Sequence, residues 1–444
     1  MIKSVIRFLI IKIKDSPTFL NMITVGAIAL IIKTVGFYKE IVIAETFGLS
    51  ELLDTFFIAM LIPGLVSEVF LNSFNSVFIP NYITEQKTTR NIGSFQTTSG
   101  LITISVALIF IILSFLFLDI YLKAFFSGHT QDYYDLVKLQ FYTLLPCILF
   151  WGLSSLLTGL LNIYDEFLYT SFSSVVIPLS IITCLMFFHV ELKDAVLATG
   201  TLIGSVLQFL ILLSIALTKN VIQIDKPDFF SQNAVIMFRQ VPAKISSGLI
   251  SGVNPIVDQF FSAQLFIGSI TALNYGNKIP SFTIGIIGMG IGTVILPYFS
   301  KHAVDNKKDA FNKLNEILKY IICGSIVLLI FSVVLSKPII ELLFERGAFE
   351  AADTLVVSKI QQMYLLQIPS YISGLVMVKF LTSINKNNFM VFASLISLTL
   401  NIILNYIFIK YMEVFGLALA TSVVSLINSI VLYIYIRKLN SKDF

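Results

Sequence analysis

Charged side chains are scarce in this chain. Lys, Arg, Asp and Glu make up 13% of its 444 residues, whereas soluble proteins carry about 25%. The net charge is only +4, so the composition does not favour a nucleic-acid partner. An ordinary soluble protein of this length is therefore excluded.

Residues that build metal, disulfide and nucleotide sites are also few or scattered. The three cysteines lie in apolar runs without CxxC spacing, so neither a disulfide framework nor a metal site is expected. His129, His189 and His302 lie in separate connections, which argues against a membrane enzyme acting on polyprenyl phosphate. No Walker motif occurs, so direct use of ATP is not expected. We predict no catalytic residues.

Long apolar runs are abundant. Hydrophobic residues make up 56% of the chain, and runs of about 20 such residues recur along its length. We count about twelve runs, centred near residues 28, 67, 107, 151, 178, 206, 245, 283, 326, 370, 399 and 427. This predicts an all-α integral membrane protein. Residues 1–17 alternate basic and apolar side chains, which predicts an amphipathic segment at the membrane surface and not a removable signal.

Basic residues of the connections identify the cytoplasmic side. With twelve spans, Lys and Arg gather on one face: before the first span, in the second and eighth connections, and after the last span. The opposite face carries acidic connections such as "ELLFERGAFEAAD" at 341–353. Both termini are therefore predicted to be cytoplasmic.

Two segments of the chain repeat a proline pattern. Pro63 and Pro80 are 17 residues apart, as are Pro280 and Pro297, and the offset between the pairs is 217 residues. That offset is close to half the chain, so we predict two six-helix lobes, residues 1–222 and 223–444, related by a pseudo-two-fold axis along the membrane normal. This plan favours a transporter over an enzyme.

Several ionisable residues fall inside the apolar runs, where each costs about 2.5–3.5 kcal/mol and marks a candidate site. They are Lys33, Lys39, Glu68, Arg239, Lys244, Asp258 and Lys278. The alternative is that a lysine near the interface extends its ammonium to the headgroups. That explains Lys39 as well as function does, but it explains Lys33 and Lys244 less well, because apolar residues flank both.

The cations come mainly from the first helices of the two halves. A cavity rich in lysine and arginine favours an anion, and the anion most suited to a membrane carrier is a lipid-linked phosphate or pyrophosphate. Arginine would bind phosphate through two fixed hydrogen bonds, whereas lysine acts as a flexible point charge. The predominance of lysine therefore predicts attraction by charge.

Three separated motifs resemble those of the MurJ/MviN family of lipid II flippases, within a superfamily that also contains multidrug and polysaccharide exporters. The first reads "KTVGFYKEIVIAETFGLSELLDTFFIAMLIP" at 33–63, the second "LLFERGAF" at 342–349 and the third "GLALATS" at 416–422. They occur in the family's order, and the resemblance covers nearly the whole chain. It implies a fold of the MurJ and MATE type.

The chain departs from the family pattern at several positions. Lys33, Lys39 and Lys278 stand where the family has cavity arginines, so the charge is kept and the planar fork is lost. Ser67 and Glu68 replace an arginine pair after the span-two proline, which reverses the local charge. Family members also typically carry further spans that form a groove for the lipid tail.

The resemblance implies a flippase that carries an undecaprenyl-pyrophosphate-linked saccharide, lipid II or a related molecule, to the outer leaflet of the cell (inner) membrane. Its predicted substrate-binding residues are Lys33, Lys39, Lys278, Arg239 and Lys244. The predicted gate or ion-pair residues are Glu40, Asp54, Glu68 and Asp258. We expect no bound cofactor, and a driving force from the membrane potential or a coupled monovalent cation. Proteins of cell-wall or polysaccharide synthesis are the expected protein partners.

Two other functions stay open. A cation-coupled multidrug exporter of the same architecture would favour cavity carboxylates, and the excess of lysine argues against it. A degenerate flippase that only binds partners is the second, because Ser67 and Glu68 change the charge of the cavity wall.

Overall fold

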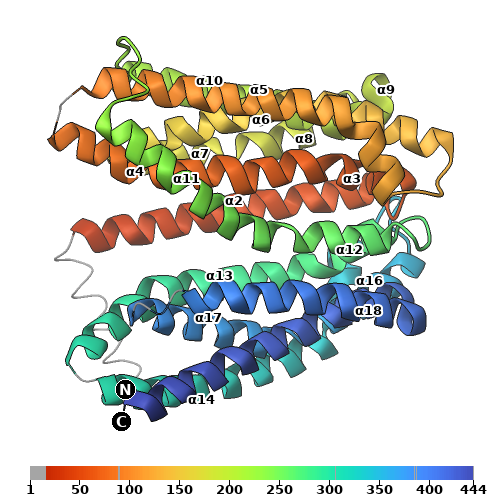
Figure 1. The fold of residues 1–444 in the computed structure, drawn as a ribbon. Coiled ribbons are helices and arrows are strands. Elements are labelled where there is room, and N and C mark those ends of the chain that lie inside the picture. Colours follow the sequence, from red (N-terminus) through yellow and green to blue (C-terminus); the bar gives the residue numbers. More distant parts are fainter. Residues whose placement is uncertain (1–16, 89–90, 306, 385, 387, 444) are drawn as a thin grey trace. The chain divides into compact units, whose positions relative to one another are not determined.

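A computed structural model describes residues 17–88, 91–305, 307–384, 386 and 388–443 (Figure 1). These residues form helices joined by short connections, and they contain one isolated β-bridge, between Arg346 and Phe349. The predicted all-helical fold is confirmed. The amphipathic segment predicted for residues 1–17 lies, except for Pro17, outside the described residues.

The helices of the first half of the sequence follow the predicted apolar runs. They are α2 (Pro17–Phe47), α3 (Glu51–Leu65), the π-helix η1 (Val66–Leu71), α4 (Asn72–Lys87), α5 (Ile92–Phe125), α6 (Gln131–Ile163), α7 (Phe167–Ser173), α8 (Val176–Phe187), α9 (His189–Leu192), η2 (Lys193–Ala195) and α10 (Val196–Thr218). Those of the second half are α11 (Gln232–Gly252), α12 (Asn254–Ser262), α13 (Ser269–Asp305), α14 (Lys307–Val334), α15 (Ser336–Phe344), α16 (Ala351–Leu365), α17 (Ile368–Ser383) and α18 (Asn388–Asp443).

All twelve predicted span centres fall within these helices. In the described part of the chain, eight helical stretches are long and apolar enough to cross a membrane. One of them is α18, which contains two predicted spans on either side of Glu413, where φ is +50°. A non-glycine residue with positive φ breaks the regular helix, so α18 is two helices joined without a loop.

The chain folds into two compact units. Unit 1 comprises Met1–Ile43, Ala59–Tyr121 and Thr130–Ile245. Unit 2 comprises Ala44–Ile58, Leu122–His129 and Ser246–Phe444. The units differ from the predicted lobes in three short stretches of the chain. The two six-helix lobes and their pseudo-two-fold axis stay a prediction.

Small residues bring α10 and α8 together in unit 1. Gly200 and Gly204 are one turn apart on α10, and each lies directly against the backbone of α8. A Cβ on Gly200 would lie 2.9 Å from Cα of Ile181, and one on Gly204 would lie 2.7 Å from Cα of Ile177. Close helix packing through such glycines is common in membranes, where burial from water adds no force.

Aromatic rings fill the interior of unit 2. Phe380 of α17 packs edge-on against Phe299 of α13 and Phe311 of α14, with ring centroids 5.1 and 5.0 Å apart. All three side chains are buried. Helices α13, α16, α17 and α18 lie alongside one another in the same unit (Figure 1). These contacts pack the helices of unit 2 against one another.

The connection between α10 and α11 is bound to the start of α5. The Gln96 side chain accepts from the backbone N–H of Gln223 (2.8 Å) and donates to the Val221 carbonyl (3.0 Å). The hydroxyls of Thr97 and Thr98 accept from the N–H groups of Asp225 (3.2 Å) and Asp228 (2.9 Å). Although it joins the two halves of the sequence, this connection is an ordered part of unit 1.

An ion pair holds the start of the same connection. Lys219 Nζ lies 2.5 Å from the Glu166 carboxylate, just beyond the ends of α10 and α6. The hydrogen bond to Glu166 raises the pKa of the Lys219 ammonium above its usual value. Both groups are partly exposed to solvent, so the pair contributes little to stability.

The four prolines of the repeat lie inside helices and end none of them. Pro63 lies in α3 and is followed by the π-helix η1, whereas Pro80 lies in α4. Pro280 and Pro297 lie within the continuous α13. Proline lacks the N–H that the helix needs, and the π-helical turn after Pro63 is one way to accommodate that loss.

Candidate functional site

The cations of α2 have different surroundings. Lys39 Nζ lies 2.8 Å from Glu40 Oε1, and the two side chains are 21% and 11% exposed. Lys33 is partly buried two turns earlier on the same helix. Glu40 therefore offsets the charge of Lys39, so an anion approaching Lys39 would have to compete with a carboxylate.

A polar pocket of about 490 Å³ lies within unit 1, and we call it the Glu68 pocket. It is lined by residues of α3, η1, α6 and α10: Gly64, Ser67, Glu68, Trp151, Ser154, Ser155, Thr158 and Gln208. Carboxylate, hydroxyl, amide and indole groups thus face one space. None of these lining residues is a Lys, Arg or His.

Local geometry explains how α6 and η1 build this pocket. Trp151, Ser154, Ser155 and Thr158 follow the i, i+3, i+4, i+7 spacing, which places them on one face of α6. Glu68 belongs to η1, and π-helical turns are frequent at functional sites because they re-aim side chains.

The remaining cations of unit 1 belong to α11. Arg239 is exposed, and the side chain of Lys244 lies outside the part that the structure describes. Two hydrogen bonds join α11 to α4: Asn81 to Gln240 at 2.9 Å and Asn233 to Glu85 at 2.5 Å. These bonds hold α11 against α4.

Asp54 binds the start of α13 in unit 2. Its carboxylate accepts from the N–H of Gly268 (2.6 Å), the N–H of Thr271 (2.8 Å) and the Thr271 hydroxyl (2.7 Å). A carboxylate at this position satisfies amide groups that have no partner within the helix and complements the positive end of its dipole. Among the described residues, the partners of Asp54 are thus a helix terminus and a hydroxyl.

Gly347 shapes a turn of unit 2 that contacts the end of α2. Gly347 has φ of +58°, and a Cβ there would lie 2.3 Å from the Glu45 carbonyl oxygen. The next amide, that of Ala348, donates to the same carbonyl at 2.8 Å. The "FERGAF" motif therefore needs glycine at 347 so that its turn can approach the end of α2.

Asp258 and Lys278 line one pocket of about 270 Å³ within unit 2, and we call it the Asp258 pocket. The Asp258 carboxylate accepts from the side-chain amides of Asn405 (2.7 Å) and Asn401 (3.2 Å) on α18. Other lining residues are mostly polar: Gln259, Asn274, Asn277, Ser281 and Tyr364. The pocket thus holds one carboxylate and one ammonium among amides.

The predicted site residues divide between the units. Lys33, Lys39, Glu40, Glu68 and Arg239 belong to unit 1. Asp54, Asp258 and Lys278 belong to unit 2. Within each unit the structure brings together Lys39 with Glu40, and Asp258 with Lys278. Their proposed roles stay predictions.

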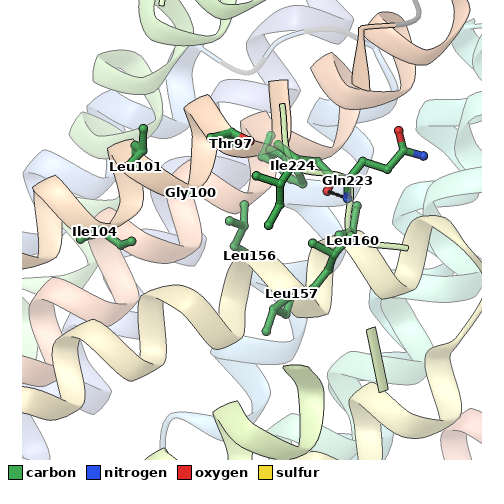
Figure 2. Close-up of a pocket in the computed structure, with 12 residues that line it drawn as sticks. Thr97, Gly100, Leu101, Ile104, Leu156, Leu157, Leu160, Gln223 and Ile224 are labelled. Atoms are coloured by element: carbon green, nitrogen blue, oxygen red, sulfur yellow. Dashed lines mark hydrogen bonds between the residues drawn. The ribbon is translucent and has the colours of Figure 1, made fainter. Parts of the chain in front are cut away.

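Another pocket of unit 1 is almost entirely apolar. Figure 2 shows Leu156, Leu157 and Leu160 of α6 beside Ile224 of the α10–α11 connection. The volume of this apolar pocket is about 250 Å³. Helix α6 therefore presents hydroxyls and an indole to one space and leucines to another. Among the described residues there is no group of three or more His, Cys, Asp or Glu that could hold a metal ion.

Sequence reasoning missed two sets of polar residues. Trp151, Ser154 and Thr158 form a helical stripe inside an apolar run, and that spacing could have revealed them. Asn401 and Asn405 are one turn apart in another run, but nothing local links them to Asp258, more than 140 residues earlier. Uncharged polar residues cost less in a membrane than charges, so their signal in the sequence is weaker.

Comparison with known proteins gives one consistent result. The family model for "Lipid II flippase MurJ" matches residues 43–444. A probable lipid II flippase MurJ of Buchnera aphidicola subsp. Schizaphis graminum is 28% identical over 93% of this chain and 82% of its own length. The lipid II flippase MurJ of Thermosipho africanus is 28% identical over 93% of this chain and 84% of its own length.

Solved structures agree with the sequence comparison. A lipid II flippase MurJ in an inward closed conformation has a TM-score of 0.81 at 26% identity, covering 94% of this chain and 87% of that one. An inward-facing MATE multidrug resistance transporter has a TM-score of 0.73 at 12% identity, covering 94% of this chain and 98% of that one. The latter likeness concerns the fold alone.

Proposed function

Because this chain belongs to the MurJ family of lipid II flippases, we propose that it carries a lipid-linked saccharide from the inner to the outer leaflet of the cell membrane. The substrate class is an undecaprenyl-pyrophosphate-linked saccharide, either lipid II or a related molecule. The single observation that carries this proposal is the family match over residues 43–444. The family resemblance and fold predicted from the sequence are thereby confirmed.

In the proposed mechanism, cations of both halves attract the pyrophosphate. Lys33 of α2 and Lys278 of α13 are the principal candidates, because Glu40 already offsets the charge of Lys39. Arg239 and Lys244 of α11 are the further proposed cations. The two lobes then alternate between access from the inner and the outer leaflet, while the polyprenyl tail stays in lipid.

The membrane potential would assist this movement. An anionic head group moves outward down an inside-negative potential, which is worth about 2.3 kcal/mol per elementary charge per 100 mV. No nucleotide motif is needed for such a driving force.

A coupled monovalent cation is the second proposed source of energy, and the Asp258 pocket is where it would bind. Carboxylate and amide oxygens are the ligands that hard cations prefer. Asn405 Oδ1 is buried and has no hydrogen-bond partner in the structure, so an oxygen is available beside the carboxylate. The residues present therefore fit such an ion, and Asp258, Asn401 and Asn405 would hold it.

Multidrug export is less well supported. The MATE likeness concerns the fold alone, whereas the MurJ family model matches most of the chain. Cationic drugs would favour cavity carboxylates, whereas lysine predominates among the ionisable residues of the apolar runs.

Complementation tests the proposed function directly. Cells depleted of their own lipid II flippase should survive when this protein is expressed, and lipid-linked head groups should become accessible at the outer leaflet. A protein that reaches the membrane at normal abundance but exposes no head group would leave only a partner-binding role. Drug resistance without head-group exposure would favour the multidrug exporter.

Topology is a separate part of the proposal. We expect both termini in the cytoplasm and residues 341–353 outside, because basic connections face the cytoplasm. In a cysteine-free background, a membrane-impermeant thiol reagent should modify a cysteine placed at Ala352 and spare one placed at Asn306, which lies outside the described residues. Labelling of the second in intact cells would reverse the orientation.

A further inference from the structure

The Glu68 pocket has a composition that the attraction of pyrophosphate does not explain. A pyrophosphate site needs cations, yet the described residues around this pocket include none, and Glu68 adds a negative charge. The described lining therefore lacks the cations that bind a phosphate group. Its hydroxyls, amide, indole and carboxylate suit an uncharged group with many hydroxyls, or a cation.

One hydroxyl of the pocket has no partner. Ser154 is only 4% exposed, lines the pocket, and its Oγ makes no hydrogen bond in the structure. Buried side-chain oxygens in folded proteins almost always have a partner. A ligand hydroxyl would satisfy Ser154, and Thr158, one turn further along α6, would face the same ligand.

Trp151 is already fixed by hydrogen bonds on one side. Its indole Nε1 donates to Ser205 Oγ at 2.8 Å, and Ser205 in turn donates to the Thr201 carbonyl at 2.7 Å. The polar atom of the indole is therefore used within unit 1. What Trp151 offers to the pocket is its hydrocarbon ring surface, whose negative face attracts polarised C–H groups.

These groups together match the surface of a sugar. A pyranose ring has C–H groups on one face and hydroxyls around its edge, which suit an indole, a carboxylate, an amide and several serine or threonine hydroxyls. The pocket volume of about 490 Å³ lies within the usual range for small-molecule sites. We propose that the Glu68 pocket receives a saccharide unit of the lipid-linked head group.

This inference rests on the proposed function and assigns two parts of the head group to different residues. Lysines attract the pyrophosphate, whereas the Glu68 pocket recognises the sugar attached to it. An organic cation is the competing occupant, since a carboxylate and an aromatic ring also bind cations. The four hydroxyls of Ser67, Ser154, Ser155 and Thr158 and the amide of Gln208 favour the saccharide, because a cation would not satisfy them.

Trp151 itself provides the measurement, because it is the chain's one tryptophan. Its fluorescence in detergent-solubilised protein therefore reports on this pocket alone. Titration with lipid II should change the emission saturably, and millimolar N-acetylglucosamine should produce a weaker change of the same kind. Bare undecaprenyl pyrophosphate and inorganic pyrophosphate should leave it unchanged.

Two variants keep the fluorophore and test the assignment. Glu68→Gln should weaken lipid II binding by about ten-fold, as expected when a charge-assisted hydrogen bond becomes a neutral one. Thr158→Val, which keeps the side-chain volume, should weaken it by a few-fold. Glu191→Gln removes an exposed carboxylate elsewhere in unit 1 and should change nothing.

The outcomes separate this inference from the proposed function. Equal responses to lipid II and to bare undecaprenyl pyrophosphate, or a response to tetraphenylphosphonium but to no saccharide, would overturn the sugar pocket. Head-group exposure in cells without any saccharide response of Trp151 would overturn the pocket and leave the flippase. A saturable saccharide response that Glu68→Gln weakens supports the pocket even in protein that fails to complement.

Discussion

The Glu68 pocket and the Asp258 pocket both place a carboxylate among polar side chains inside an apolar protein, but their partners differ. Asp258 accepts two amide hydrogen bonds and shares its pocket with Lys278. Glu68 shares its pocket with hydroxyls, an amide and an indole, and with no lysine or arginine among the described lining residues. The first pocket thus contains groups of both signs, whereas the second combines a carboxylate with uncharged polar groups among its described lining residues.

This difference matters because moving a charge into the interior of a membrane protein costs free energy, and another interaction must offset that cost. An ion pair or a bound ion offsets the cost of moving a carboxylate out of water. Asp258 accepts hydrogen bonds from two side-chain amides, and Lys278 lines the same pocket. Glu68 is an exposed residue, and the other described residues that line its pocket are uncharged. We therefore expect an ion at the Asp258 pocket and hydroxyl groups at the Glu68 pocket.

The largest expected effect comes from removing the cations. The double variant Lys33→Gln, Lys278→Gln should abolish head-group exposure, because one principal cation is lost from each half. Protein abundance should stay normal, since removing a charge from an apolar helix lowers its cost of insertion. Lys33→Arg keeps the charge and should stay active. Full activity of the double variant would contradict the mechanism in which lysines attract the pyrophosphate.

The next largest effect should follow from Asp258→Asn. The amide keeps the side-chain volume and loses the charge, so transport should fall by about ten-fold and lose its dependence on monovalent cation concentration. Transport into sodium-free and potassium-free media measures this dependence. Glu341→Gln, on the exposed side of α15, is the matched control. Unchanged cation dependence in the Asp258 variant would leave the membrane potential as the proposed driving force.

A smaller effect is expected at Lys39. Because Glu40 lies 2.8 Å from its ammonium, Lys39→Gln should reduce transport only about two- to three-fold, as for one partly offset charge. Lys33→Gln alone should reduce it more. Initial rates of head-group exposure for the two single variants decide the order. A larger loss at Lys39 would show that the Glu40 pair opens during transport.

The smallest effect should appear at Asp54 as a change in stability. Asp54→Ala removes an acceptor from the start of α13 and should cost about 1 kcal/mol, lowering the thermal midpoint by roughly 2–4 °C. Asp54→Asn keeps one acceptor oxygen and should lower the midpoint less. Thermal unfolding in detergent measures both, with Glu51→Gln in the same turn as a control. Equal midpoints for wild type and Asp54→Ala would contradict the capping role.

Much of the fold could be predicted from the sequence, because apolar runs as long as a bilayer is thick leave few alternatives to a helix. The family could also be predicted, from motifs such as the one containing Gly36, Lys39 and Asp54. The partners of Asp54 could not, since the start of α13 is more than 200 residues away and no local pattern encodes that contact.

The π-helix after Pro63 shows a second limit. Proline predicts a disturbance of the helix, but not whether the chain bends, ends or inserts a residue. Here the chain forms η1, and Glu68 lines the pocket from it. The sequence showed a reversed charge at 67–68 without showing what lies opposite. Trp151 and Ser154 of α6 supply that missing context.

The ordered connection between α10 and α11 has a consequence for handling the protein. Long connections between the halves of a transporter are preferred sites of proteolytic nicking, because a protease needs free, extended backbone. Here Gln96, Thr97 and Thr98 hold the backbone amides or carbonyls of residues between 221 and 228. A protease would therefore have to detach the connection from α5 before cleaving it. We expect this connection to resist proteolysis in the intact chain.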